Sequence, residues 1–518
     1  MLALNIASRP LRELFRPLAY AQVAPVPFLL AERLLTELFG VNEWALRALP
    51  LIAGLALCGV VVLVARRMLR PDEALVAFVL VAFSSALVRY SAEVKPYSLD
   101  ALLSVALVGV AADLIRRTDR WKAWALLSGL GAITVLGSLA SVFVCLGVGV
   151  ALAVHAVMEK RWNVLPLVGL MGLGWALLFG GGYVRLYQEE TGAPYMRSFW
   201  EGSFLVPGTP DLLARTRVAM SEVSWGIYPG MALLGLGGVT FCLVLLGAVT
   251  LWRRKEAPNA FLLLVPGLAP FAASAVGVYP IAMRLTLFAA PLFLMLAAVG
   301  VVVAGRAAHR FLPRVPMRWV IALLLLPAVT SAFASMLQER DQQMRPLLQS
   351  LAERWGPTDP VYIFHRVVPA WLFYTTDWTE PDIAQLNWAM RVSGPGGIGH
   401  ENGPSRGPRP AGEGRELVYR LKGRNVLLGT SSGVQGRPMF GYLPRDPDPG
   451  WAANEGRRMR LSAGPRIWVI LGNASHEGTD LGAILLSALA EEGGRLTFRD
   501  SLQDGKLYQL EFAPVTPP

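Results

Sequence analysis

The stretch "RYSAEVKPYSLDALLSVALVGVAADLIRR", residues 89–117, combines three kinds of sequence that together decide the fold. It opens with charged residues and two tyrosines, continues as an apolar run over 98–115, and closes with two arginines. An apolar run that approaches about 20 residues can cross the hydrocarbon core of a bilayer, and a helix pairs all its backbone groups there. The stretch therefore predicts a membrane-spanning helix with one basic end and one end rich in ionisable side chains.

The composition of the whole chain indicates the same class of protein. Of the 518 residues, 54% are hydrophobic and 16% are charged, and the mean hydropathy is +0.45, whereas soluble domains carry about 25% charged residues. Cys58, Cys145 and Cys242 lie inside apolar runs, so we interpret them as small buried hydrophobic residues rather than disulfide partners. The net charge of +11 fits nucleic-acid binding or basic membrane loops, and the positions of the cations must decide.

Apolar runs of similar length recur along the first two thirds of the chain. We therefore expect a polytopic α-helical membrane protein, a bundle of about ten spans. The runs cover 49–65, 73–88, 98–115, 123–138, 140–157, 163–185, 229–251, 260–278, 286–304 and 319–337.

Lysine and arginine residues follow every second apolar run, and the positive-inside rule assigns such connectors to the cytoplasm. The other connectors hold fewer cations. We therefore expect the 89–100 connector, the 186–228 loop, the 277–284 connector and everything after 337 to lie on the outer side. Topology thus accounts for the basic excess, and we expect no nucleic-acid partner. The cytoplasmic connectors carry Arg66, Arg67, Arg70, Arg116, Arg117, Arg120, Lys122, Lys160, Arg161, Arg253, Arg254, Lys255, Arg306, Arg310, Arg314 and Arg318.

The same alternation places residues 1–44 on the outer side, although Arg9, Arg12 and Arg16 would resist export. We therefore expect that a first spanning helix belongs before the first residue of this chain. Within this segment, "LAYAQVAPVPFLLAERLLTELFG" (18–40) contains an amphipathic pattern that is too polar to span. It predicts a helix that lies in the outer interface of the membrane.

The sequence changes in character after residue 337, which divides the chain into a membrane domain over 1–337 and a second domain over 338–518. Strand and helix patterns alternate there, so we expect a small extracytoplasmic α/β domain. A Gly/Pro/Arg-rich stretch near 394–416 predicts a disordered loop. No glycine-rich nucleotide fingerprint follows a predicted strand, so we expect no nucleotide site. The predicted elements are a strand and helix over 359–378, a strand over 466–473, a helix over 481–494, and strands over 495–502 and 506–512.

The 89–100 connector is the first candidate for chemistry. An interfacial anchor would explain its tyrosines and Arg89. It explains less well why Glu93 lies two residues from Lys95, or why Asp100 enters an apolar helix. Placing an aspartate or lysine deep in a bilayer costs about 2.5–3.5 kcal/mol, so such residues usually face a cavity. Function and anchoring therefore both remain open from the residues alone.

A second candidate is "GVYPIAMRLTLF" (277–288), with Tyr279 and Arg284 at the outer end of a predicted span. A lone interfacial arginine is commonly an anchor. Its planar guanidinium would also suit a phosphate, because it can pair two oxygens at once.

These three pieces, 5–54, 89–103 and 279–296, resemble the GT-C superfamily of polytopic glycosyltransferases. They are most similar to the bacterial glycosyltransferase family 39, which is akin to the protein mannosyltransferases and the aminoarabinose transferase of lipid A. The resemblance covers roughly 4–304. It implies a bacterial-type inner-membrane enzyme that transfers a sugar from a polyprenyl-phosphate donor to an extracytoplasmic glycan, lipid or protein acceptor. The resemblance implies no specific cofactor, and a divalent metal ion is compatible with it.

The resemblance also implies roles for individual residues. The main catalytic aspartate of the family precedes a segment like "LALNIASRP" and is not present in this chain. His365, His400 and His476 are too scattered along the sequence to predict a metal cluster. The implied catalytic residues are Glu93 and Asp100, the implied substrate-binding residues are Arg89, Lys95, Tyr97, Tyr279 and Arg284, and the implied loop beside the site holds Gln22 and Pro25.

Two other functions remain open. A membrane transporter would predict charges near mid-span and broken helices in paired halves, whereas the ionisable residues gather at one face. A catalytically inactive relative that binds sugar lipids or acts as a scaffold is favoured by the missing aspartate. The enzyme hypothesis predicts that Glu93, Lys95, Tyr97 and Arg284 converge on one outward-facing cavity.

Overall fold

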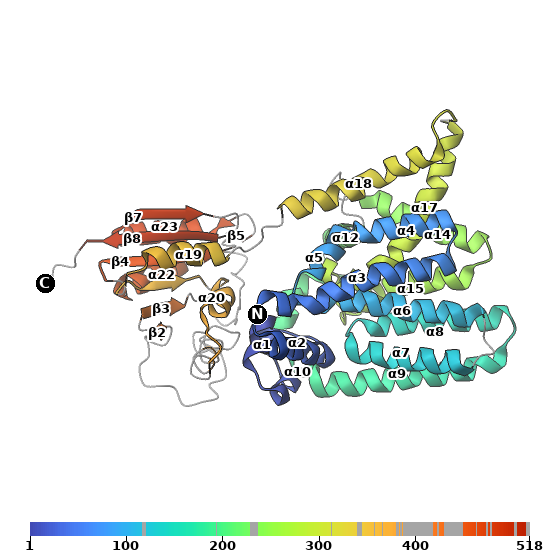
Figure 1. Cartoon of the computed structure of the whole chain (residues 1–518), viewed down its shortest axis with the longest axis horizontal. Helices are drawn as coiled ribbons and strands as arrows, with labels where there is room; N and C mark the ends of the chain where they lie inside the picture. The colour runs from blue at the N-terminus through green and yellow to red at the C-terminus, as the bar shows by residue number, and fades with distance from the viewer. Residues whose placement is uncertain are drawn as a thin grey trace. The chain divides into compact units, whose positions relative to one another are not determined.

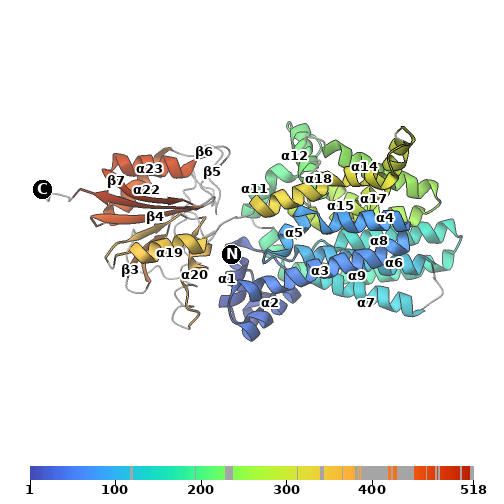
Figure 2. The same cartoon turned by 45° about the horizontal axis from the view of Figure 1, so that its top comes forward.

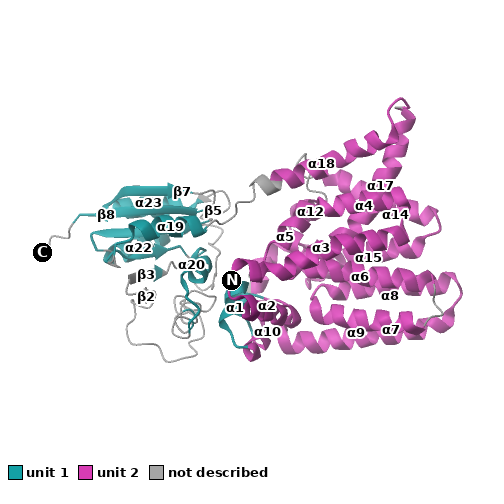
Figure 3. Ribbon diagram, viewed as in Figure 1, with its two compact units in different colours: residues 1–10, 17–22, 338–518 teal, residues 11–16, 23–337 magenta. Residues whose placement is uncertain are grey.

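The chain divides into two compact units (Figure 3). The first, here called the membrane unit, contains Leu11–Arg16 and Val23–Leu337; the second, the α/β unit, contains Met1–Pro10, Pro17–Gln22 and Gln338–Pro518. The computed structural model describes residues 1–116, 121–192, 194–227, 237–311, 313–338, 344–356, 358–364, 366–379, 383, 386, 418–421, 424–428, 449–462, 464–472, 475–476, 479–501 and 505–513.

Helices make up the secondary structure of the membrane unit wherever the structure describes it (Figure 1). In chain order they are η1 (Leu11–Phe15), α2 (Val26–Phe39), α3 (Glu43–Met68), α4 (Pro71–Ala82), α5 (Ser85–Ser91), α6 (Tyr97–Arg116), α7 (Trp121–Gly137), α8 (Ser141–Met158), η3 (Trp162–Val164), α9 (Leu165–Leu186), α10 (Gln188–Thr191), α11 (Pro194–Trp200), η4 (Glu201–Ser203), α12 (Leu212–Ile227), α14 (Gly237–Arg253), α15 (Ala257–Ala275), α16 (Met283–Thr286), η5 (Leu287–Ala289), α17 (Ala290–Phe311) and α18 (Met317–Gln338).

The predicted helical membrane fold is confirmed. In the described residues, seven helical stretches are long and apolar enough to cross a bilayer, and α4 with α5 forms a further pair bent by 52°. Helices α7 and α14 are also apolar but have 17 residues each, so they are shorter than a typical span. Each expected apolar run falls on one of these helices, although the expected start at 229 lies outside the described residues. The chain is therefore a multi-pass membrane protein.

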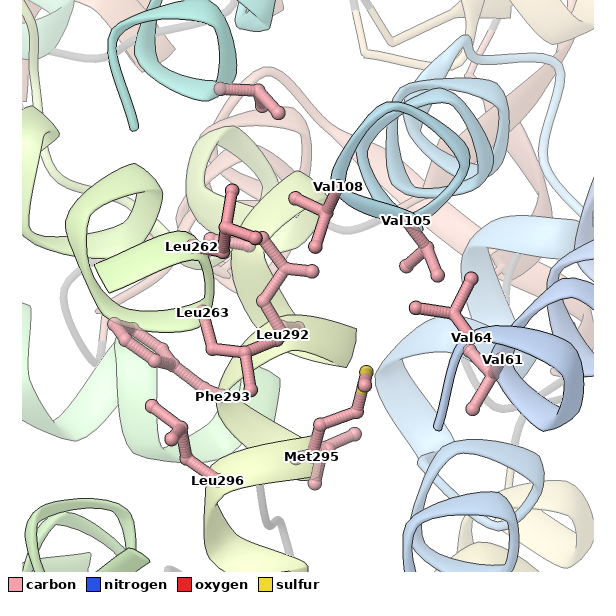
Figure 4. Packing of buried hydrophobic residues seen from close by; sticks show 14 of the residues in the cluster. Val61, Val64, Val105, Val108, Leu262, Leu263, Leu292, Phe293, Met295 and Leu296 are labelled. Atoms are coloured by element: carbon pink, nitrogen blue, oxygen red, sulfur yellow. The ribbon is translucent and has the colours of Figure 1, made fainter. Parts of the chain in front are cut away.

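Helix α17 forms the centre of the membrane unit, because its side chains are buried on every face over its first three turns. Two glycines allow α14 to approach it closely. A Cβ atom at Gly300 would lie 2.1 Å from the carbonyl oxygen of Leu243, and one at Gly247 would lie 2.0 Å from that of Leu296. Small residues at helix contacts are typical of membrane bundles, where close packing replaces the hydrophobic effect. In Figure 4, α17 contributes Leu292, Phe293, Met295 and Leu296 to a core shared with Leu262 and Leu263 of α15, Val105 and Val108 of α6, and Val61 and Val64 of α3.

The arginine-rich helix ends pair with carboxylates. Arg254, just after α14, donates from its two terminal nitrogens to Glu73 in the first turn of α4, at 2.6 and 2.9 Å. Glu73 is fully buried, so this bidentate pair compensates a charge that would otherwise be costly to remove from water. Two further ion pairs are more exposed. Arg306 of α17 pairs with Asp72 in the first turn of α4 at 2.6 Å, and Arg67 near the end of α3 pairs with Asp113 near the end of α6 at 2.9 Å.

The α/β unit contains a six-stranded sheet in the order β2-β3-β1-β4-β8-β7, which confirms the predicted α/β fold. Strands β3, β1 and β4 are parallel, with Val361 opposite both Val426 and Trp468, and β2, β8 and β7 are antiparallel to their neighbours. Figure 2 shows α23 on one side of this sheet and α19 on the other. The predicted loop near 394–416 lies outside the described residues. The elements are α19 (Met344–Arg354), β1 (Val361–Ile363), α20 (Val368–Thr375), β2 (Val418–Leu421), β3 (Arg424–Leu428), α22 (Pro449–Ser462), β4 (Arg466–Gly472), β5 (Ser475–His476), β6 (Thr479–Asp480), α23 (Leu481–Glu491), β7 (Gly494–Ser501) and β8 (Gly505–Phe512).

Met1–Pro10 and Pro17–Gln22 belong to the α/β unit. The sequence instead predicted that they belong to the membrane domain. Helix α1 (Leu2–Ser8) contacts α20, and a short turn, η2 (Ala19–Ala21), follows it. The buried amide of Asn5 joins the two pieces, because it accepts from the backbone N–H of Ala19 at 2.8 Å and donates to its carbonyl at 3.1 Å. Sequence patterns could not reveal this grouping, since its contacts are made with residues more than 350 positions away.

Replacing Gly300 with alanine should separate α14 from α17, because the added methyl group would overlap a backbone oxygen. Overpacking of this kind costs about 1–3 kcal/mol, so Gly300→Ala should lower the thermal stability of the detergent-solubilised protein. Gly174→Ala is the matched control, since nothing lies within 4 Å of a Cβ atom there. Equal melting temperatures for the two variants would contradict the close approach.

Removing Arg254 should leave the Glu73 carboxylate buried without its main partner. We expect Arg254→Met to destabilise the protein by about 3 kcal/mol, measured by thermal unfolding in detergent. Arg67→Ala removes an exposed pair from the same helix ends and should cost about 0–1 kcal/mol. If the two variants melt alike, the Glu73 pair is no more important than a surface ion pair.

Candidate functional site

The candidate site forms where two connectors of the membrane unit meet, the one between α5 and α6 and the one between α15 and α16. Helix α12 packs against both α5 and α16, and η5 packs against α6. These contacts bring residues 89–100 and 279–286 together from distant parts of the sequence. The site lies at the end of α6 opposite to the paired arginines described above.

The α5–α6 connector turns tightly around Glu93. The Nε atom of Arg89 donates to Glu93 Oε1 at 3.1 Å, one helical turn apart, and the two side chains are 42% and 39% exposed. The backbone N–H of Lys95 donates to the carbonyl of Glu93 at 2.8 Å, and Pro96 then begins α6 by accepting from the N–H of Asp100. Glu93 and Lys95 are therefore held close together at the start of the span.

Lys95 is electrostatically coupled to the second connector. Its pKa is lowered from the usual lysine value to about 8, because burial disfavours the ammonium form and the positive charge of Arg284 adds to this. Glu93 acts in the opposite direction and favours the charged form. Arg284 is therefore close enough to Lys95 to influence its charge, although the two residues belong to separate segments.

Arg284 rests on aromatic rings. Its guanidinium carbon lies 4.8 Å from the ring centre of Trp200 and 5.9 Å from that of Phe199. The preceding residue, Met283, donates its backbone N–H to Glu222 Oε2 at 2.8 Å. In the part of the chain that the structure describes, Arg284 forms no ion pair with a carboxylate.

Tyr97 and Asp100 lie in the first turn of α6, and Asp100 is less accessible than Glu93. Tyr97 packs its ring edge-on against Tyr90, with 5.0 Å between the ring centres. Asp100 is only 8% exposed, and the Ser138 hydroxyl lies within hydrogen-bonding reach of its carboxylate. Its Oδ1 atom has no hydrogen-bond partner among the described residues. Of the two predicted catalytic carboxylates, Glu93 is therefore the accessible one.

Tyr279 has a local structural contact. Its hydroxyl donates to the carbonyl of Leu285 at 2.9 Å, and its ring meets Phe143 edge-on at 4.7 Å. Its pKa is raised, first by burial and then by the negative charge of Asp100. These contacts fix the turn that precedes α16, and a role in substrate binding stays a prediction.

The structure brings the predicted residues together, whereas their roles in catalysis and binding stay predictions. Arg284 lies within electrostatic range of Lys95 and Tyr97, and Glu93 lies within range of both of these residues. Sequence reasoning missed Phe199, Trp200 and Glu222, which come from the 186–228 loop. The aromatic pair in "RSFWEG" was a visible signal, but its partner Arg284 is far away in the sequence.

The described residues do not fit a divalent metal ion. No group of three or more histidine, cysteine, aspartate or glutamate side chains is arranged to hold one in the described ranges. Glu93 is engaged by Arg89, and His365 and His400 lie outside the described residues. No step of a reaction is therefore assigned to a metal.

The loop that the resemblance implied beside the site has a contact within itself and another with a distant segment. The Gln22 side-chain amide donates to the carbonyl of Tyr20 at 3.1 Å. Pro25 is the residue that precedes α2, and the N–H of Val26 donates to the hydroxyl of Tyr187 at 3.1 Å. That the loop of Gln22 and Pro25 lies beside the site stays a prediction.

Residues 22–180 match the protein family described as dolichyl-phosphate-mannose-protein mannosyltransferase. The match confirms the resemblance to polytopic glycosyltransferases that the sequence predicted. It includes the 89–100 connector and ends before Trp200 and Arg284. No curated protein sequence matches the chain.

Several solved structures are similar to this chain. ArnT from Cupriavidus metallidurans in the apo state is 12% identical, with 98% of this chain and 93% of that chain covered and a TM-score of 0.49. The same protein bound to undecaprenyl phosphate is 11% identical over the same shares, with a TM-score of 0.48. The oligosaccharyltransferase AglB from Archaeoglobus fulgidus, in complex with an inhibitory peptide and a dolichol-phosphate, is 12% identical over 98% of this chain and 70% of that chain, with a TM-score of 0.42.

The charge of Lys95 should change near neutral pH. Since its pKa is about 8, reaction with an amine-specific reagent, followed by mass spectrometry, should rise to half its maximum near pH 8. Arg284→Ala should move this midpoint upward, because the repulsion that lowers the pKa is removed. Lys160, which is exposed, corrects for the reagent's own pH dependence. An unchanged midpoint in Arg284→Ala would contradict the coupling.

Proposed function

We propose that this chain is a membrane glycosyltransferase that takes a sugar from a polyprenyl-phosphate donor and transfers it to an extracytoplasmic acceptor. The observation that carries the proposal is the meeting of Lys95 and Arg284: burial lowers the pKa of Lys95, and the positive charge of Arg284 lowers it further. An anionic group bound between them would relieve this repulsion. The family match over residues 22–180 supports a lipid-phosphate sugar as the source of that anion.

The two cations would act most strongly on the leaving group. A polyprenyl-phosphate sugar carries one negative charge on its phosphodiester, and the phosphate gains a second as its bond to the sugar breaks. Groups that bind charge developing in the transition state accelerate the reaction rather than merely tighten binding. Arg284 can pair two phosphate oxygens, and Lys95 supplies a compact positive charge.

The reaction is a displacement at the anomeric carbon. The acceptor hydroxyl oxygen forms a bond to this carbon, the bond from the carbon to the phosphate oxygen breaks, and its electron pair leaves with the polyprenyl phosphate. We assign the hydroxyl proton to Glu93, because this carboxylate is 39% exposed and adjoins Lys95. Asp100 is too deeply buried to meet an acceptor.

The proposed setting is a bacterial-type inner membrane, with the site and the α/β unit on the extracytoplasmic side. The paired arginines at the opposite end of α6 support this orientation, since cationic helix ends favour the cytoplasm. The acceptor is a glycan, a lipid or a protein. Incubation of the purified protein with labelled polyprenyl-phosphate sugars and with each acceptor class in turn would identify both substrates.

Variants at the two cations and the carboxylate should separate binding from turnover. Lys95→Ala and Arg284→Ala should each lower sugar transfer by about 10²–10³-fold and weaken the binding of undecaprenyl phosphate in nanodiscs. Glu93→Gln should lower transfer by about 10²–10⁴-fold and leave undecaprenyl phosphate binding close to that of the unmodified protein. Lys160→Ala is the control for loss of a remote cation.

Two outcomes would contradict parts of the proposal. Full transfer by both cation variants would remove their role at the phosphate. Binding of polyprenyl-phosphate sugar by the unmodified protein without transfer to any acceptor class would favour the alternative, a sugar-lipid binding protein without transferase activity.

A further inference from the structure

Arg284, one of the two cations of the proposed phosphate site, lies against two aromatic rings. The guanidinium lies over Trp200 and Phe199, with its carbon 4.8 and 5.9 Å from the ring centres. The two rings meet edge-on, 4.7 Å apart at 84°. A guanidinium that stacks on a ring keeps its N–H groups at its edge, where they can still pair with an anion.

The segment that carries Trp200 is fastened to the segment that precedes Arg284. The backbone N–H of Ile281 donates to the carbonyl of Ser203 at 2.8 Å, and the N–H of Leu205 donates to the hydroxyl of Ser274 at 3.0 Å. Ser274 is fully buried, so this second bond is shielded from water. These two bonds hold the residues just after Trp200 against the segment that leads to Arg284.

The aromatic rings can hold Arg284 near Lys95 even though the two positive charges repel each other. Lys95 repels Arg284, and no carboxylate forms an ion pair with Arg284 within the described residues. A carboxylate would hold the guanidinium in place but would also neutralise it and compete with the phosphate. The face of an aromatic ring attracts a cation without removing its charge.

We propose that Trp200, supported by Phe199, is a positioning residue that holds Arg284 close to Lys95, so that both cations are in place before a lipid phosphate binds. The proposal rests on the proposed function, since it assumes that Lys95 and Arg284 bind the phosphate. Trp200 and Arg284 both lie outside residues 22–180, so the family match does not include this pair.

The proposal predicts how conservative and non-aromatic replacements differ. Trp200→Leu fills much of the same space without a π face and should weaken the binding of undecaprenyl phosphate by about fivefold. Trp200→Phe keeps the aromatic face and should retain most of the affinity. Trp200→Leu should also raise the pH at which Lys95 becomes half-reactive toward an amine reagent, because Arg284 is no longer held beside it.

The experiment measures binding of undecaprenyl phosphate, without a sugar, to the full chain in nanodiscs. It compares the unmodified protein with Trp200→Leu, Trp200→Phe, Arg284→Ala and the double variant Trp200→Leu/Arg284→Ala. Arg197→Ala is the matched control, since this exposed arginine lies on the same short helix, α11. Thermal melting checks that each variant is folded.

If Trp200 acts through Arg284, the double variant should bind no more weakly than Arg284→Ala alone. Two results would overturn the positioning role while leaving the phosphate site intact. One is unchanged binding by Trp200→Leu. The other is that adding Trp200→Leu to Arg284→Ala weakens binding by as much as Trp200→Leu does in the unmodified protein. Unchanged binding by Arg284→Ala would instead refute the phosphate site itself, and the positioning role would fall with it.

Discussion

The burial of α17 on every face is the constraint on which the membrane unit depends. This helix can occupy the centre of the bundle only because Gly300 and Gly247 let the backbones of α14 and α17 approach each other. Its position has a direct consequence for the site, since α16 and η5 lead into α17 without a long connector. Arg284, in α16, is therefore placed by the packing of the most buried helix in the unit rather than by a free loop.

The arginines at the two ends of α6 are held in different ways, although Arg89 pairs with Glu93 at the end that carries the site. At one end, arginines meet carboxylates, and the buried Glu73 is fully satisfied by Arg254. At the other end, Lys95 and Arg284 approach each other, and Arg284 is held by aromatic rings. The carboxylates neutralise the arginines at the first end, whereas the aromatic rings leave the charge of Arg284 in place. This difference separates a structural end of the bundle from one that is suited to chemistry.

Burial also distinguishes the two carboxylates that the resemblance treated alike. Both belong to one twelve-residue motif in the sequence, yet Glu93 is in the exposed turn and Asp100 faces inward from the first turn of α6. The charge and burial of neighbouring groups decide which acid can meet a substrate. The motif predicted the candidate residues, and the tertiary structure shows which of the two carboxylates is accessible.

The sequence by itself determined the membrane spans and the alternation of strand and helix after residue 337, because hydrophobic length and periodicity are local properties. It also located Lys95, Tyr97 and Arg284, since ionisable residues at the ends of apolar runs stand out. Only the tertiary structure decided that Trp200 supports Arg284, that Glu73 meets Arg254, and that the first residues of the chain group with the α/β unit. Each of these contacts joins segments that are distant along the chain, and packing between helices, which no local pattern encodes, brings them together.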